Sequence, residues 1–294
     1  MFRRVIVGVD GEEGGQDAIA LANVLREDGE LTFAYVYSGD VNLWRGSNPA
    51  YEAEEHDRSR ALLEQARETS GIQARLRSHG SPSVGRGLHE LAEITDADLL
   101  VLGSSRRGLL GRVLIGDDTR AALNGAPCAV AIAPAGYAHE PHLMREIGVG
   151  YNGSPESDHA LRLARSLAGR HHSKLSAFEA VSFPTYVFTQ PAAGDAYSVK
   201  ALVDAARERV SALEGVEPHA AYGLAADELA LYSASLDLLV IGSRSYGPIG
   251  RLVHGSTAQQ LARVARCPLL VLTRAAHQAE ESDARETAAA GSAT

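Results

Sequence analysis

The stretch DLLVLGSSRRGLLGRVLIG at Asp98–Gly116 is repeated as DLLVIGSRSYGPIGRLVHG at Asp237–Gly255. Each copy runs from an apolar segment into a glycine-rich turn. Gly103 and Gly242 stand 139 residues apart, and the single cysteines of the two halves keep the same spacing. A duplicated domain is the simplest explanation.

The turn after each apolar segment is a candidate anion site. A strand that ends in glycine and is followed by further Gly and Ser residues exposes backbone N–H groups, which cradle anions such as phosphate. The repeat therefore predicts two candidate phosphate-binding turns.

Length, charge and cysteine content indicate the number of domains and exclude several classes of protein. A chain of 294 residues favours two domains, each able to bury its own core. The net charge of −9 disfavours a general affinity for nucleic acid or for anionic membranes. Two cysteines cannot form a disulfide framework, and each precedes an apolar run where a small buried residue fits. The first apolar run meets Asp10 too early for a signal peptide, so we expect a cytoplasmic protein without a membrane span.

Each half alternates short apolar runs with helical patterns, which is typical of a parallel sheet covered by helices. The pattern predicts five strands in each half, at Val5–Asp10, Glu30–Tyr37, Gln73–Ser78, Asp98–Gly103 and Ala129–Ala133, then Ile147–Tyr151, Lys174–Ala180, His219–Tyr222, Leu236–Ile241 and Leu269–Thr273. Four helices are expected in each half, at Gln16–Glu27, Tyr51–Thr69, Val84–Thr95 and Asp117–Leu123, then Pro155–Ala168, Ala201–Leu213, Ala226–Ala234 and Ser256–Ala265. Gly29, Gly71 and Gly125 follow three of the helices and are interpreted as C-terminal stops.

The domain boundaries follow from this alternation. We expect a first domain at residues 1–136, a polar linker at 137–145 and a second domain at 146–274. The tail at 275–294 has no hydrophobic period and is expected to be disordered.

In an open parallel sheet, ligands bind at the carboxyl ends of the strands, where the strand order reverses. Asp10 follows the first strand and Gly103 ends the fourth, so both are expected at one crevice. The second half offers Asn152 and Gly242 at the corresponding places.

Both halves, at about 1–136 and 146–274, resemble universal stress protein domains. That family has an Asp after the first strand and a later Gly, two residues, Gly, nine residues, Gly, Ser/Thr. The resemblance implies two Rossmann-like domains of the adenine nucleotide alpha hydrolase type, each with a five-stranded parallel sheet of order 3-2-1-4-5. It also implies that ATP-binding members hold adenine and ribose by strands one and two and the phosphates on the glycine turn, whereas several members bind no nucleotide.

The first half matches the family pattern at Asp10, Gly103 and Gly116. It departs from the pattern at Arg106, which replaces a glycine, and at Asp117, whose carboxylate replaces a hydroxyl and repels phosphate. This half is therefore the weaker candidate nucleotide site.

The second half keeps the phosphate end better, because its last glycine is followed by hydroxyl residues that would begin a helix. Asn152 keeps an oxygen acceptor but not the charge of the usual Asp, and Ser245 replaces the middle glycine. The favoured nucleotide-binding residues are Asn152, Gly242, Ser243, Ser245, Gly255, Ser256 and Thr257.

Other site classes find little support. The run Gly148–Gly153 matches GxGxxG, but it lies within and at the end of a strand, whereas a dinucleotide fingerprint follows one. No Walker A lysine pattern is present, so Mg²⁺ is expected only with a bound nucleotide. The histidine pairs lack partners at metal-ligand spacing, and no catalytic residue is identified, so we expect neither a metal site nor an enzyme.

Three hypotheses remain. The favoured one is a stress-response module that binds ATP or a related adenine nucleotide in the second domain and acts on a protein partner. The alternative is a pseudo-symmetric interaction scaffold whose two sites bind no nucleotide, and the third is an enzyme that transfers adenylyl or phosphoryl groups. In the family the last strand pairs across a dimer, so Ala129–Ala133 and Leu269–Thr273 are expected to pair within the chain, between two chains, or both.

Overall fold

The computed structural model describes residues 2–38, 49–104, 117–140, 143–182, 199–243 and 256–273. The predicted tail lies outside these ranges. The elements of the first half are β1 (Arg4–Gly8), α1 (Glu13–Leu25), β2 (Glu30–Ser38), α2 (Pro49–Ser70), β3 (Arg75–Ser81), α3 (Val84–Ile94), β4 (Leu99–Gly103), α4 (Asp117–Leu123) and β5 (Ala129–Ala133). A short 3-10 helix, η1 (Tyr137–His139), leads into the second half.

The second half repeats this order. Its elements are β6 (Glu146–Gly150), α5 (Pro155–His171), β7 (Lys174–Val181), α6 (Val199–Ser211), β8 (Glu217–Tyr222), α7 (Ala225–Tyr232), the 3-10 helix η4 (Ser233–Ser235), β9 (Leu238–Gly242), α8 (Ser256–Val264) and β10 (Leu269–Leu272). The predicted alternation of strands and helices is confirmed in both halves.

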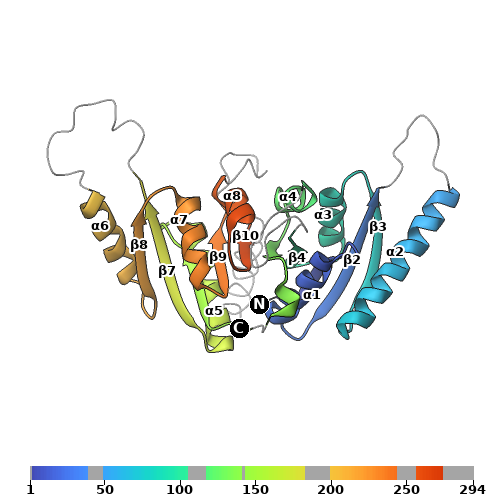
Figure 1. The fold of residues 1–294 in the computed structure, drawn as a ribbon, viewed down its shortest axis with the longest axis horizontal. Helices are drawn as coiled ribbons and strands as arrows, with labels where there is room; N and C mark the ends of the chain where they lie inside the picture. Colours follow the sequence, from blue (N-terminus) through green and yellow to red (C-terminus); the bar gives the residue numbers. More distant parts are fainter. Residues whose placement is uncertain are drawn as a thin grey trace, which may run out of the picture.

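All ten strands form one sheet, in the order β3-β2-β1-β4-β5-β10-β9-β6-β7-β8. Each half therefore has the order 3-2-1-4-5, with parallel neighbours, as the resemblance implied. The halves meet where β5 and β10 pair antiparallel, with Ala131 opposite Leu270. Figure 1 shows the result as two similar wings, with α2 and α6 at the outer ends.

The pairing of β5 with β10 decides between the alternatives left open by the sequence. Each of these strands has a neighbour on both sides, β4 and β10 for β5, and β5 and β9 for β10. Neither leaves a hydrogen-bonding edge for a second chain. Of the three possibilities, the structure therefore has the pairing within the chain.

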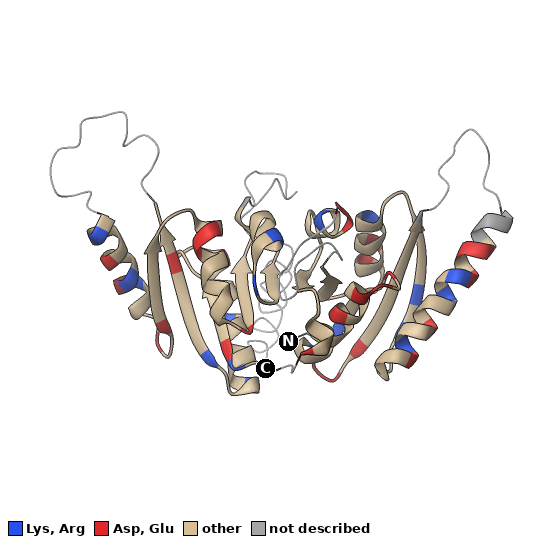
Figure 2. Cartoon of the chain, viewed as in Figure 1, with Lys and Arg blue, Asp and Glu red and all other residues tan. Residues whose placement is uncertain are grey.

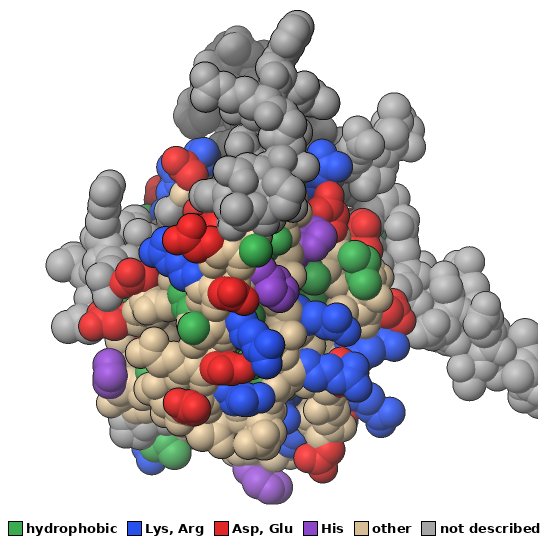
Figure 3. All heavy atoms as spheres, turned by 90° about the vertical axis from the view of Figure 1, so that its right-hand side faces the viewer, with side chains coloured by type: hydrophobic (Ala, Val, Ile, Leu, Met, Phe, Trp, Pro, Cys, Tyr) green, Lys and Arg blue, Asp and Glu red, His purple; other side chains and the backbone are tan. Residues whose placement is uncertain are grey.

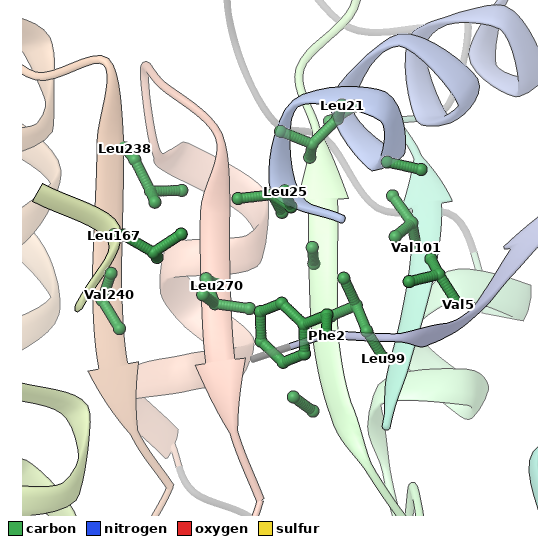
Figure 4. Packing of buried hydrophobic residues seen from close by; sticks show 14 of the residues in the cluster. Phe2, Val5, Leu21, Leu25, Leu99, Val101, Leu167, Leu238, Val240 and Leu270 are labelled. Atoms are coloured by element: carbon green, nitrogen blue, oxygen red, sulfur yellow. The ribbon is translucent and has the colours of Figure 1, made fainter. Parts of the chain in front are cut away.

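One hydrophobic cluster crosses the seam between the halves. It contains residues of β1, β4 and α1 from the first half together with residues of β9, β10 and α5 from the second. Figure 4 shows the ring of Phe2 between Leu270 of β10 and Leu99 of β4. Because both halves share this core, we expect them to unfold together.

The helices cover the two faces of the sheet. Successive residues of a strand point to opposite faces. Phe33 of β2 lies in the cluster with α1, α2, α5 and α6, whereas its neighbour Ala34 lies in a second cluster with α3, α4, α7 and α8. Both cysteines are buried in the second cluster, as predicted, and burial raises the pKa of the Cys128 thiol to about 12.

Arg170 ties the two halves together outside the sheet. This residue near the end of α5 donates from Nη1 to the carbonyl of Arg26 at 3.1 Å, and from Nη2 to those of Val24 and Leu25 at 2.9 and 3.0 Å. These carbonyls end α1, where helix carbonyls lack intrahelical partners and attract cations. Nη2 also lies 3.0 Å from Nε2 of His171, and burial together with the Arg170 charge lowers the pKa of this histidine.

Two of the three predicted helix stops are confirmed. Gly71 and Gly125 have φ angles of +66° and +84°, which favour glycine. Gly29 was interpreted wrongly, because α1 already ends at Leu25 and Gly29 has no positive φ. A Cβ at Gly29 would lie 2.2 Å from the carbonyl oxygen of Arg3, so this glycine permits close backbone approach beside β2.

In the part of the chain that the structure describes, no helix is both long and apolar enough to cross a membrane.

Candidate functional site

The first half contains a crevice of about 280 Å³ at the carboxyl ends of β1, β2 and β4. Its floor includes small and apolar residues, among them Ala34, Val36 and Leu88. Its polar lining includes Asp10 and Asp118. A concave site with a largely apolar floor and a few converging polar groups is the usual form of a small-molecule site. The crevice lies where the strand order reverses, as predicted.

Asp10 lies in this crevice two residues after β1. Its Oδ1 accepts the backbone N–H of Glu12 at 3.0 Å, which closes the turn into α1. The same carboxylate lines the crevice and can accept a hydrogen bond from a ligand hydroxyl or amine. Asp10 thus has a role in the turn that does not depend on a ligand.

The glycines that end β4 and β9 have a packing role in both halves. A Cβ at Gly103 would lie 1.9 Å from the carbonyl oxygen of Gly14, in the first turn of α1. A Cβ at Gly242 would lie 2.4 Å from the carbonyl oxygen of Glu156, in the first turn of α5. Both glycines are required for this helix contact, whether or not a phosphate binds beside them.

The start of α4 carries negative charge at the rim of the crevice. Asp117 and Asp118 both lie in its first turn, and Asp118 lines the crevice. Asp117 is exposed and pairs with Arg120 at 2.8 Å. The Thr119 hydroxyl donates to the Gly103 carbonyl at 3.4 Å. The Asp118 carboxylate at this rim disfavours a phosphate and favours hydroxyl or amine groups.

Asn152 of the second half has the same local geometry as Asp10. Its Oδ1 accepts the backbone N–H of Ser154 at 3.1 Å, and its own N–H lies 3.4 Å from the Ser157 hydroxyl oxygen. Asn152 therefore performs the same turn-closing role with an uncharged side chain.

Phe178 distinguishes the second half from the first. Gly8, at the end of β1, pairs with Ala34, whereas Gly150, at the end of β6, pairs with Phe178. The Phe178 ring is buried and stacks on Tyr232 at a centroid distance of 4.9 Å. A large aromatic ring thus stands where an alanine lines the first crevice.

The next residue along the strand also differs between the halves. Tyr35 lines the first crevice, and Glu179 takes the corresponding position in β7. The buried Glu179 carboxylate accepts from Nη2 of Arg209 at 2.6 Å and from Nε at 3.3 Å. This ion pair from β7 to α6 has no counterpart at Tyr35.

The candidate phosphate-binding residues of the second half follow β9 and begin α8, and the structure describes some of them. Ser243 is buried and donates its backbone N–H to Leu272 at 2.9 Å. Ser256 begins α8, followed by the half-buried Thr257, and the first turn of this helix carries no acidic residue. Four predicted site residues lie outside the described residues, namely Arg106, Gly116, Ser245 and Gly255.

The structure thus brings Asp10 and Gly103 to one crevice in the first half, and Asn152, Gly242 and Ser243 to the ends of neighbouring strands in the second. Within the described ranges, no three His, Cys, Asp or Glu side chains gather in a way that could hold a metal ion. Sequence reasoning missed Ala34 and Phe178. Aligning β2 with β7 through the repeat would have revealed this exchange of a small for a large residue.

Comparison with known proteins gives consistent results for both halves of the chain. The model of the universal stress protein family matches residues 1–134 and again residues 144–273. The universal stress protein Rv2005c of Mycobacterium tuberculosis is 28% identical over 289 residues, which cover 91% of this chain and 96% of that protein.

A solved structure of similar extent agrees with the fold. The crystal structure of a universal stress protein from Archaeoglobus fulgidus covers 92% of this chain and 98% of its own, with a TM-score of 0.64 and 17% identity. A universal stress protein solved in complex with cAMP covers 46% of this chain and 98% of its own, with a TM-score of 0.35 and 23% identity.

Proposed function

Because this chain belongs to the universal stress protein family, we propose that it is a stress-response binding module that takes an adenine nucleotide or nucleoside in the crevice beside Asp10. The observation that carries this proposal is the crevice of about 280 Å³, which has apolar lining residues and the Asp10 carboxylate beside them. Its volume lies near the lower end for small-molecule sites, which suits a base and a sugar.

The residues of the crevice suit the two parts of a nucleoside. Ala34, Val36 and Leu88 offer apolar contact to a planar base, and the Asp10 carboxylate offers an acceptor to ribose hydroxyls. Asp118 faces the same space, so phosphate groups add less affinity here than a helix start without acidic residues would give them. We therefore expect adenosine to bind at least as well as ATP.

The sequence favoured the second half, chiefly for its phosphate end. Ser245 and Gly255, on which that preference depends, are not described, so it stays a prediction. Phe178 favours the first half, because it takes the strand position of Ala34 in the second half, and a larger side chain there leaves less room for a ligand.

A second candidate function is an interaction scaffold without a nucleotide. The packing roles of Gly103 and Gly242 support it, because they explain the family glycines without any ligand. On either proposal the chain acts by binding and not by turnover, in the cytoplasm, and with Mg²⁺ only as part of a bound nucleotide.

The exchange of Asp10 and Asn152 between the halves supplies a matched test. Isothermal titration calorimetry of the full chain with adenosine, AMP and ATP is expected to show saturable binding of adenosine. Asp10→Asn keeps the oxygen that closes the turn and removes the charge, so we expect about tenfold weaker binding. Asn152→Asp is the control and should leave the affinity unchanged.

The outcomes separate the two candidates. If Asp10→Asn and Asn152→Asp weakened adenosine binding equally, the assignment of the binding site to the first half would be contradicted. A protein that carries no small molecule after purification and takes up none of the three ligands at millimolar concentration would favour the scaffold.

A further inference from the structure

The outer edge of β3 is an open edge of the sheet. β3 is the first strand in the order and pairs only with β2 among the described strands. The opposite terminal strand, β8, carries Pro218, which has no N–H to donate. β3 contains no proline along its seven residues. An unpaired strand edge is a ready template for another extended segment.

A groove of about 540 Å³ runs between this edge and α2. Its lining is strongly basic, with Arg60, Arg67, Arg75 and Arg77 against a single acidic residue, Glu64. Figure 2 shows basic positions on both α2 and the sheet edge, and Figure 3, which views this side directly, shows blue side chains gathered on its surface. The local charge is opposite in sign to the net charge of −9 of the chain.

Ion pairs neutralise only part of this charge. Arg60 pairs with Glu64 at 3.2 Å, and Arg75 pairs with Glu30. Arg67 and Arg77 form no ion pair with any residue that the structure describes. Unpaired guanidinium groups beside a groove are available to carboxylates, which they bind in a bidentate manner.

The arginines flank the edge of β3 on both faces of the sheet. Arg75, Arg77 and His79 alternate along the strand and so share one face. His79 bonds to Glu90 of α3 at 2.8 Å, which identifies that face as the one covered by α3. Arg67 belongs to α2, which packs on the opposite face. If a strand were added at this edge, the side chains on each of its two faces would lie near guanidinium groups.

We propose that this edge docks an extended, acidic segment of a protein partner as an additional strand beside β3. The open backbone supplies hydrogen bonds, and the four arginines select for Asp and Glu side chains in the added segment. The site lies at the outer edge of the sheet and is distinct from the crevice beside Asp10.

The test uses a fluorescein-labelled octapeptide in which two Glu and two Val residues alternate as pairs, so that an added strand carries Glu on both faces. It is titrated into the full chain and followed by fluorescence anisotropy. The Glu peptide is expected to bind, and the matched Lys and Val peptide is not. The double variant Arg60→Glu/Arg67→Glu is expected to weaken binding about tenfold, because it reverses two of the four charges. The control Lys200→Glu/Arg207→Glu makes the same charge change on exposed positions of α6, the counterpart of α2, and should have no effect.

Hydrogen–deuterium exchange gives the second readout. Docking as a strand is expected to slow exchange of amides within Arg75–Ser81. Unchanged exchange of β3 with the peptide bound would overturn strand addition. Equal weakening by both double variants, or full competition by inorganic tripolyphosphate at equal charge, would also overturn the proposal, because either result indicates a general attraction of polyanions.

Discussion

Replacing Arg170 by methionine tests how firmly the two halves are joined. The guanidinium contacts three carbonyls at the end of α1 at 2.9 to 3.1 Å. A buried bond to a charged group contributes about 1.5–3 kcal/mol, but water reaches this partly exposed site and can replace part of each bond. We therefore take the three contacts together to stabilise the fold about as much as one charge-assisted hydrogen bond. Arg170→Met should lower the free energy of unfolding by about 2 kcal/mol.

Urea unfolding followed by far-UV circular dichroism measures this loss. With a slope of about 3 kcal/mol per molar urea, the midpoint should fall by about 0.7 M and the slope should not change. Lys200→Met is the control, because the exposed pair of Lys200 with Asp204 should contribute less than about 0.5 kcal/mol. A shift no larger than that of the control, or two separate transitions in the wild type, would refute the reasoning from a shared core.

Three further results are expected. Gly103→Ala should lower the free energy of unfolding by about 3 kcal/mol in the same urea titration, because the added Cβ overlaps the α1 backbone. Gly169→Ala is the control: its added Cβ meets nothing within 4 Å, so the free energy of unfolding should rise by about 0.5–1 kcal/mol. His171 has a folded pKa below its ordinary value of 6.5, so its contribution to stability is present above pH 6.5 and is lost as the pH falls through the folded pKa. The melting temperature should therefore fall between pH 7.5 and pH 5, and it should fall less in His171→Gln. Cys128 and Cys267 are buried with raised pKa values, so Ellman's reagent at pH 8 should find no reactive thiol in the native chain and two in urea, and fast labelling of the native chain would contradict their burial.

Much of the fold follows from the repeat and from hydrophobic patterning. The constant spacing between Gly103 and Gly242 predicted two equivalent halves, and the alternation of apolar runs and helices predicted their elements. The joining of the halves could not be predicted, because β5 and β10 are apolar strands that could have paired either with each other or with a second chain. Gly29 was misassigned because the sequence does not show where the Arg3 backbone lies.

The candidate site could be predicted in position but not in shape. Asp10 was placed correctly at the reversal of strand order, since topology determines that place. The size of the side chains beside the first strand of each half was not predicted, and it differs at one paired position, which is Ala34 in the first half and Phe178 in the second. The basic groove beside β3 was missed for a related reason, because its arginines come from a helix and a strand that meet only in the fold.

The most direct test of the account is the number of adenosine molecules bound per chain, measured by calorimetry for the wild type and for Ala34→Phe. This substitution gives the first half the residue that takes the same strand position in the second half, and a thermal melt checks that the variant is folded. We expect one site per chain in the wild type and none in the variant. Two sites in the wild type, or undiminished binding by a folded Ala34→Phe variant, would contradict it.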